Sequence, residues 1–415
     1  MTIQSTRVRM AAILLAACAS TAILATPALA QRAPSTSASV GRHLQAAQKA
    51  AQANDLPKAK EEVAAAKEAA SSDFDKYKAA QMEMYVDVKM NDMAGAAVAA
   101  QEVADSPAQP EAEKIGNLNP ALLLSMNSKN YPKAVVYAKA LEATNPTDPN
   151  TIEAIGNAYY LGGDFAAAKA HAEKAVAAAI AAGKKPGRNT LQVLLSAQVS
   201  LKDEAGAEDT LEKLVAYYNQ PEDWQQMIDV AFGTKGIRDV DAVWLGRLLF
   251  LSGATVSQND ATMIGGTASH LSFFGDASIA KQKGGTVDPD PIPRMEADKK
   301  DIQAQIALGQ GPKGTGTYNA KLAEALYGYG MYAEAEATAK LAISKGGNPD
   351  TSEAPMVLGQ AQAAQGKYDE ALATFGTVTG GGPATARITR LWVDYVNIKK
   401  APPVADAAPA QAAAK

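Results

Sequence analysis

An internal repeat is the feature that most constrains the fold of this chain. Residues 145–175 and 348–378 align without a gap, and both begin with Asn-Pro. In each segment a glycine lies ten residues after the proline, a second glycine follows seven residues later, and an aromatic residue and an alanine come next. Self-similarity of this length is typical of stacked supersecondary units rather than of one globular core.

Each unit has the pattern of two helices joined by a tight turn. Apolar residues recur at helical spacing over two stretches of about 12–14 residues, separated by a turn with Gly or Asn. A Gly or Asn just before the aromatic residue can end the first helix in a left-handed conformation. One such hairpin cannot bury its own apolar face, so the copies must stack. The sequence therefore predicts an all-α solenoid of helix-turn-helix repeats.

The amino-acid composition argues against several classes of function. Hydrophobic residues make up 47% of the chain but aromatic residues only 6%, so a core must be built largely from small side chains. A formal net charge of −4 argues against general nucleic-acid binding, which needs a basic surface. One cysteine and three histidines leave little for a thiolate metal site, a disulfide framework or a cysteine nucleophile. We therefore expect no cofactor, no metal and no nucleic-acid partner.

The first thirty residues have the layout of a secretory signal. Arg7 and Arg9 precede a run of small and apolar residues that ends at Ala28-Leu29-Ala30. This arrangement predicts cleavage after Ala30 and a periplasmic or secreted protein. An uncleaved membrane anchor is the alternative, but the run ends in small residues and a proline rather than in a charged stop. No other apolar run approaches membrane-spanning length, so no transmembrane segment is expected after cleavage.

A second processing alternative involves the cysteine. Leu15-Ala16-Ala17-Cys18 resembles the lipobox of bacterial lipoproteins, in which Cys18 would carry the lipid. The residues after Cys18 stay apolar, whereas the start of a mature lipoprotein is usually a polar tether. Simple cleavage is therefore the favoured prediction.

The repeated residues resemble the tetratricopeptide repeat (TPR). Ile155-Gly156 and Ala168 carry the pattern in residues 116–178, and Leu358-Gly359, Ala371 and Phe375 carry it in residues 318–380. The aromatic residue four positions after the alanine is present as Phe375, but Ala172 replaces it in the earlier copy. The resemblance implies a right-handed solenoid in which the first helix of each unit lines a concave groove.

Turn residues and composition divide the chain into seven segments. Alternating prolines in residues 284–293 predict a loop there, and residues 294–308 are predicted to be helical. The expected order is a signal peptide (1–30), a linker (31–39), N-terminal TPR-like repeats (40–218), a divergent helical middle (219–283), a loop-helix-loop linker (284–317), C-terminal TPR-like repeats with a capping helix (318–398) and a disordered tail (399–415).

The resemblance also points to the side chains of the groove. Ligand contacts in tetratricopeptide arrays come from the first helix of each unit, around its small residue. A buried place in the core is the alternative for the three tyrosines in this set. The predicted groove residues are Gln81, Tyr85, Glu153, Asn157, Tyr160, Gln192, Ser196, Glu324, Tyr327 and Gln360.

The sequence contains a motif and residue types that could indicate catalysis, but their context does not support a catalytic site. Gly309-x-Gly311-x-x-Gly314 matches the dinucleotide fingerprint, but a predicted helix precedes it instead of a strand, and Pro312 removes a backbone donor. We expect this segment to be a flexible linker. His43, His171 and His270 lie far apart in the sequence, and no catalytic residue is predicted.

These observations predict a non-enzymatic scaffold of the cell envelope. The amide- and tyrosine-rich groove set suits an extended peptide or a helix of a protein partner. Alternatives are a carbohydrate-binding solenoid and an accessory subunit of an envelope enzyme using Glu153 or Glu324. Ring faces in the groove would favour a glycan, and a ladder of amides would favour a peptide. A buried histidine paired with an acid would be needed to support catalysis.

Overall fold

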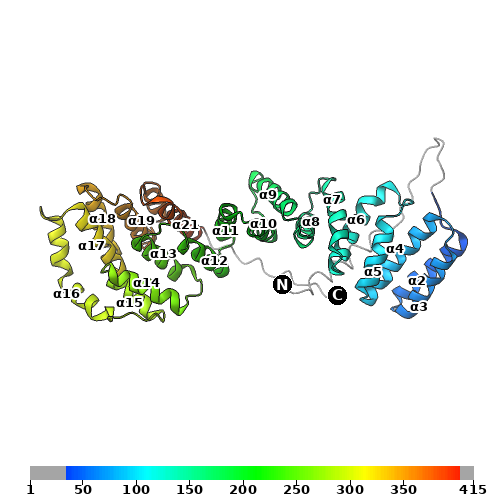
Figure 1. Cartoon of the computed structure of the whole chain (residues 1–415), viewed down its shortest axis with the longest axis horizontal. Helices are drawn as coiled ribbons and strands as arrows, with labels where there is room; N and C mark the ends of the chain where they lie inside the picture. The colour runs from blue at the N-terminus through cyan, green and yellow to red at the C-terminus, as the bar shows by residue number, and fades with distance from the viewer. Residues whose placement is uncertain (1–33, 402–415) are drawn as a thin grey trace. The chain divides into compact units, whose positions relative to one another are not determined.

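The computed structural model describes residues 34–401, which form twenty helices, α2 to α21, and no strand (Figure 1). The predicted all-α architecture of stacked helices is confirmed. Within this range no helix is both long and apolar enough to cross a membrane. The predicted signal peptide (1–30), including Cys18, and residues 402–415 of the predicted tail lie outside the described residues.

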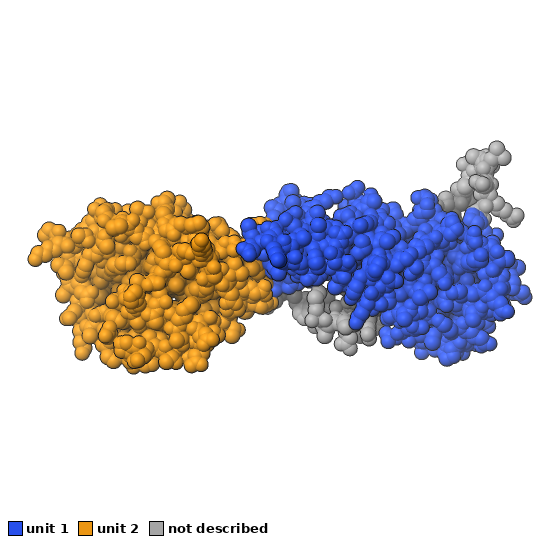
Figure 2. All heavy atoms as spheres, in the orientation of Figure 1, with its two compact units in different colours: residues 1–207 blue, residues 208–415 orange. Residues whose placement is uncertain are grey.

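The chain divides into two compact units, residues 1–207 and 208–415, which are shown in different colours in Figure 2. We call them unit 1 and unit 2 and describe each by itself. The division falls inside α11 (Glu204–Tyr218).

Unit 1 is a series of antiparallel helix pairs. The two helices of each pair pack together, the second helix also packs on the first helix of the next pair, and first helices contact one another, as α6 contacts α8 and α8 contacts α10. The pairs are α2 (Ala38–Gln52) with α3 (Leu56–Ala69), α4 (Asp73–Met90) with α5 (Met93–Ala104), α6 (Glu111–Asn127) with α7 (Tyr131–Glu142), and α8 (Pro149–Leu161) with α9 (Phe165–Ala181), followed by α10 (Arg188–Ser200).

A recurring pair of residues makes the tight turns of unit 1. The first residue of the pair has a positive φ, such as 61° at Asn91 and 80° at Gly163, and it ends the preceding helix. The second is an Asp or Asn whose side chain accepts a hydrogen bond from the backbone N–H three residues later, as Asp92 does from Gly95 and Asp164 from Ala167. The same arrangement recurs at the turns of residues 54–55, 129–130 and 202–203.

In unit 2 the last helix packs back against an early helix, so the helices form a closed arrangement. α13 packs against α14 and also against α21, the last helix, while α15, α17 and α19 contact one another in succession. The helices are α12 (Pro221–Phe232), α13 (Asp239–Ser252), α14 (Gln258–His270), α15 (Phe274–Gln282), α16 (Pro291–Gln310), α17 (Gly316–Gly328), α18 (Tyr332–Lys345), α19 (Glu353–Ala364), α20 (Tyr368–Phe375) and α21 (Gly382–Lys400).

One predicted loop is shorter than expected. α16 begins at Pro291, inside the predicted loop of residues 284–293, and it includes the predicted helix of residues 294–308. Asp290 caps this helix through the Ile292 N–H. Pro291 and Pro293 are accommodated because a proline in the first helical turn gives up an N–H that has no helical partner.

The two units have different cores. An extended cluster of unit 1, from α4 to α10, is dominated by alanines, with Tyr137 and Tyr159 inserted among them. All three tryptophans of the chain lie in unit 2, where Trp224, Trp244 and Trp392 are fully buried. The small-residue core expected from composition therefore describes unit 1 better than unit 2.

Candidate functional site

The structure distributes the ten predicted groove residues over both units. Three of them lie in unit 2, on α17 and α19: Glu324, Tyr327 and Gln360. The other seven lie in unit 1, on α4, α8 and α10: Gln81, Tyr85, Glu153, Asn157, Tyr160, Gln192 and Ser196.

Helices α8 and α10 lie side by side in unit 1 and bring five predicted residues onto neighbouring first helices. They approach at Gly156, where an added Cβ would lie 3.5 Å from Val193 Cγ1. Gln192 is exposed, and the partly exposed residues are Asn157, Tyr160 and Ser196. We call the outward side of this helix pair the α8–α10 face.

Aliphatic side chains extend the α8–α10 face. Leu161 is 44% exposed and Val199 is 63% exposed. Leu161 lies four residues after Asn157, and Val199 lies three residues after Ser196, so each pair shares one side of its helix. The face thus combines two amides, a tyrosine ring, hydroxyls and exposed aliphatic carbon, the mixture found at many protein-binding surfaces.

The remaining predicted residues of unit 1 already have partners within the unit. Glu153 accepts a hydrogen bond from Asn189 Nδ2 at 3.0 Å, which ties the start of α8 to the start of α10. Gln81 Nε2 donates to Tyr77 Oη at 2.8 Å and to a carboxylate oxygen of Glu113 at 3.0 Å. Tyr85 packs against the cluster of α2 and α3, with Lys89 Nζ 5.5 Å from its ring centre.

In unit 2 two predicted residues belong to a buried network around Arg247. Arg247 makes a two-pronged pair with Asp276, with N–O distances of 2.8 and 2.7 Å. Its Nη1 also donates to Glu324 Oε2 at 2.6 Å and to Gln360 Oε1 at 2.7 Å. Glu324 and Gln360 are fully buried, so both side chains serve the interior of unit 2.

The third predicted residue of unit 2, Tyr327, packs its ring against Arg247 at one side of this network. The Arg247 guanidinium lies 4.2 Å from the centre of the Tyr327 ring, in cation–π contact. Trp244 Nε1 donates to Glu324 Oε1 at 2.8 Å. Sequence reasoning did not find Arg247, because nothing local marks an arginine inside an otherwise apolar helix as a buried hub.

One cation faces two carboxylates in this network, and burial together with these charges shifts their pKa values. Burial raises the pKa of Glu324 above its ordinary value, although Arg247 acts in the opposite direction. Burial would lower the pKa of Arg247, but the charges of Asp276 and Glu324 outweigh it and raise that pKa. Arg247 therefore stays charged, and the network acts as a buried electrostatic centre that holds α13, α15, α17 and α19 together.

A cavity of about 310 Å³ lies beside this network, and we call it the aromatic pocket. Tyr327 and Tyr332 form one part of its wall, with ring centres 5.2 Å apart, and Trp392 and Tyr395 form another, with ring centres 5.7 Å apart. Its lining consists of Leu251, Tyr327, Tyr332, Ala363, Ala364, Tyr368, Trp392, Tyr395 and Lys399. Of the predicted residues only Tyr327 takes part.

His171 forms the acid–histidine pair that a catalytic function would require. It is only 8% exposed, and its Nδ1 lies 2.6 Å from Glu142 Oε1, while Tyr159 Oη donates to the other oxygen of Glu142 at 2.6 Å. Nε2, however, lies 2.9 Å from the carbonyl oxygen of Ile152. Both ring nitrogens are thus occupied by protein oxygens, and neither faces a place where a substrate proton could be taken up.

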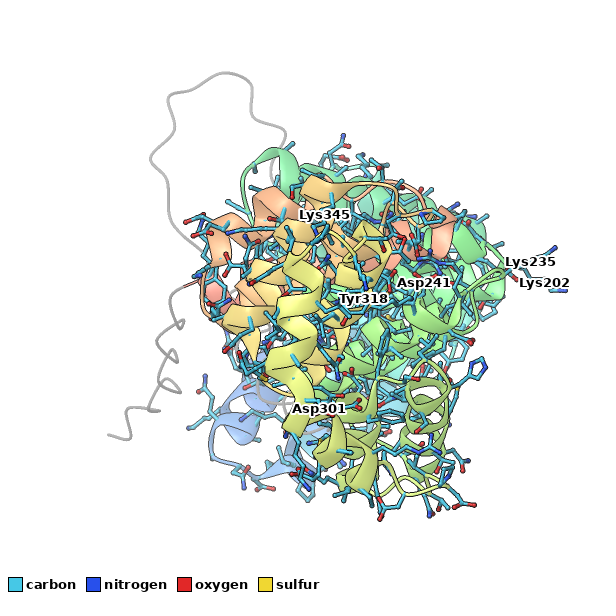
Figure 3. All side chains as sticks on the ribbon, turned by 90° about the vertical axis from the view of Figure 1, so that its left-hand side faces the viewer. Lys202, Lys235, Asp241, Asp301, Tyr318 and Lys345 are labelled. Carbon is cyan, nitrogen blue, oxygen red and sulfur yellow. The ribbon has the colours of Figure 1, made fainter. Side chains whose placement is uncertain are left out.

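The glycine fingerprint of residues 309–314 has a structural role. Lys345, at the end of α18 and labelled in Figure 3, donates from Nζ to the carbonyl oxygens of Gly309, Gly311 and Gly314 at 2.7, 2.8 and 2.7 Å. A Cβ at Gly314 would lie 2.1 Å from the Gly309 carbonyl oxygen, which explains why the turn needs glycine. The expected flexible linker is thus an ordered loop that presents carbonyls to an ammonium, whereas a phosphate site would present N–H groups.

Across residues 34–401 no three His, Asp or Glu side chains come together closely enough to hold a metal ion. Comparison with known proteins gives no further assignment, because no family model matches the chain and no curated protein matches it.

Proposed function

We propose that this protein is an exported, non-enzymatic scaffold of tetratricopeptide-like repeats in a right-handed solenoid. Its action is to bind an extended peptide or a helix of a protein partner in the cell envelope. The α8–α10 face is the surface proposed to make that contact. No chemistry is assigned to the chain.

The observation that carries this proposal is the α8–α10 face itself. It displays Asn157, whose side chain has no hydrogen-bond partner within the described residues, and the exposed aliphatic groups of Leu161 and Val199. Neutral donors and acceptors beside aliphatic carbon suit a polypeptide, which offers backbone amides and apolar side chains together. Neighbouring first helices in unit 1 provide the length that an extended segment needs.

Site-specific photocrosslinking in cells tests this surface. A photoreactive amino acid at Gln192, on the α8–α10 face, is expected to capture one defined partner band. The same group at Ala177, an exposed position on α9, is the matched control and is expected to capture none. Adding Asn157→Ala and Tyr160→Ala to the Gln192 variant should remove the band while leaving the helical circular dichroism unchanged.

Two results would contradict this assignment of the surface. Equal capture from Gln192 and Ala177 would show that proximity, not a specific face, produces the crosslink. A band that survives the double substitution would move the binding surface to another part of the molecule.

The export part of the proposal rests on the sequence of residues 1–30. Cell fractionation should find the chain in the periplasm or the medium, and N-terminal sequencing of the mature protein should begin at Gln31. A membrane-bound form with a blocked N-terminus, released by Cys18→Ala, would instead support a lipid anchor.

A further inference from the structure

We propose that the aromatic pocket of unit 2 is a binding site for an acidic sugar residue, a six-membered saccharide ring that carries a carboxylate. This site goes beyond the protein-binding function proposed for unit 1. The ring faces, the hydroxyl groups, the single charge and the size of the pocket all fit such a ligand.

The walls of the pocket are aromatic faces fixed by packing. Trp392 is fully buried, and its Nε1 donates to the backbone oxygen of Trp244 at 3.2 Å. Tyr327 is held from behind by Arg247. These two buried rings support the partly exposed rings of Tyr332 and Tyr395, which pack against them. Partly exposed rings that are held in this way offer apolar surface at little entropic cost, and the C–H face of a saccharide ring is a suitable partner for them.

The hydroxyl groups around the pocket are unused. Elsewhere in the chain buried tyrosines donate to carboxylates, as Tyr77 does to Glu113 and Tyr159 does to Glu142, both at 2.6 Å. The hydroxyls of the four pocket tyrosines have no such partner within residues 34–401. These tyrosines are Tyr327, Tyr332, Tyr368 and Tyr395. Each hydroxyl can donate one hydrogen bond and accept others, so the pocket suits a ligand with several hydroxyls of its own.

The charge of the pocket points to an anion. Lys399 is the one ionic residue of the lining, with Nζ 5.4 Å from the centre of the Tyr395 ring. Neighbouring lysines are already paired, since Lys400 bonds to Asp369 and Lys367 bonds to Glu336. No carboxylate lines the pocket, so the Lys399 ammonium is available to a carboxylate on the ligand.

The size and polarity of the pocket favour one class of ligand among those that could contact its rings, its hydroxyls and Lys399. A volume of about 310 Å³ lies at the lower end of the range of ligand pockets, so it accommodates a single ring. An aromatic carboxylic acid, such as the last residue of a peptide, would use the ring faces and Lys399 but would leave the hydroxyls unsatisfied. A saccharide ring with a carboxylate satisfies all three groups.

Titration of the full mature chain with three simple sugars, followed by saturation-transfer NMR, tests the proposal. D-Glucuronic acid should bind more tightly than D-glucose, and D-glucosamine should bind most weakly. Lys399→Gln should weaken glucuronic acid binding by about fivefold, the effect of one partly exposed ion pair, and should leave glucose binding unchanged. Lys400→Gln removes the same charge one residue away and should change neither affinity.

Further variants and a rival ligand make the result decisive. Tyr332→Phe combined with Tyr395→Phe keeps the ring faces but removes two hydroxyls, and it should weaken all three sugars. N-acetyl-L-phenylalanine that binds when glucuronic acid does not would overturn the proposal in favour of an aromatic acid. Equal effects of Lys399→Gln and Lys400→Gln, or no binding of any sugar, would also overturn it. None of these outcomes depends on the crosslinking result for unit 1.

Discussion

Unit 1 and unit 2 are built from similar helical hairpins, but their centres differ. In unit 1 each hairpin contacts its neighbours in sequence, its core is rich in alanine, and its charged pairs are spread along the stack, as around Glu142 and Glu113. In unit 2, α13 meets the final helix α21, and a buried arginine joins four helices at the centre.

This difference predicts different kinds of stability. A linear stack is stabilised by nearest-neighbour contacts, so a local defect is felt mainly by adjacent hairpins. A closed arrangement around one charged hub should lose its structure as a whole when the hub is damaged. The tryptophans make the comparison measurable, because all three lie in unit 2 and their fluorescence reports that unit alone.

The largest expected effect comes from removing the hub. Arg247→Met leaves Asp276 and Glu324 buried without their cation, and should destabilise unit 2 by about 3–5 kcal/mol. Urea unfolding followed by tryptophan fluorescence should show this loss, while much of the circular dichroism, which includes unit 1, persists to higher urea.

Two matched variants accompany this measurement. Arg42→Leu replaces an exposed arginine of unit 1 and should shift neither transition by more than about 0.5 kcal/mol. Adding Asp276→Asn and Glu324→Gln to Arg247→Met should recover part of the loss, because no buried charge then lacks a partner. Simultaneous loss of both signals in Arg247→Met would contradict separate stabilisation of the two units.

Two glycines in the same register of the repeat should respond to alanine with opposite signs. A Cβ at Gly359 would lie 2.6 Å from Phe375 Cε1, so Gly359→Ala must displace a buried ring and should cost about 1–3 kcal/mol. At Gly156 the nearest atom, Val193 Cγ1, is 3.5 Å away, an ordinary contact. Gly156→Ala should therefore stabilise unit 1 by about 0.5–1 kcal/mol through helix propensity.

Thermal unfolding of both variants, monitored by fluorescence and circular dichroism, checks these signs. Destabilisation by both substitutions would mean that the two copies pack alike, and the contrast between the units would lose this support.

The same two glycines show how far sequence reasoning extends. Their common register, the hairpins and the left-handed turns were predictable because they depend on residues close together in the chain. The different neighbours of Gly156 and Gly359 were not, because Phe375 occupies a position that is Ala172 in the other copy, and the effect of that exchange depends on packing.

The candidate sites also contain one part that was predictable from local sequence and one part that was not. Helical spacing and the repeat register were enough to place Asn157, Tyr160, Gln192 and Ser196 on neighbouring helices. The partners of Arg247 lie 29, 77 and 113 residues away along the chain, and no local pattern brings them together. The aromatic pocket is likewise formed by α17 to α21 and the end of α13, so a single predicted residue, Tyr327, reached it.

A buried carboxyl of unit 2 should make its stability depend on pH. Burial and the nearby charge of Glu212 raise the pKa of Asp394 to about 7, against the influence of Arg390. The folded state therefore binds this proton more tightly than the unfolded state does. Its contribution to stability is complete below the unfolded pKa of 3.8 and is lost as the pH rises through about 7.

Asp394→Asn should remove this dependence. We expect the variant to match the natural chain near pH 4 and to be more stable at pH 8 by about 1–2 kcal/mol, a value reduced for partial solvent screening. In unit 1 burial opposes the shift, but bonds from Tyr159 and His171 lower the pKa of Glu142, so Glu142 contributes only to a loss of stability in acid. Fluorescence-detected unfolding at several pH values separates these cases, and an equal gain at pH 4 and pH 8 would refute the titration of Asp394.

The smallest effect concerns the turns. Asp164 accepts a hydrogen bond from the Ala167 N–H, whereas the corresponding Met331 in unit 2 provides no side-chain cap and packs against an apolar cluster. Asp164→Ala should therefore cost about 1 kcal/mol in unit 1. Asp164→Asn keeps the acceptor and should be nearly neutral.

Circular dichroism and hydrogen exchange of the α8–α9 turn can measure this cost, with tryptophan fluorescence unchanged because unit 2 is not affected. If Asp164→Asn destabilises as much as Asp164→Ala, the charge of Asp164 rather than its capping bond supports the turn. The turns of the two units would then differ in electrostatics and not in hydrogen bonding, which would change the explanation of why unit 2 tolerates an apolar residue at this position.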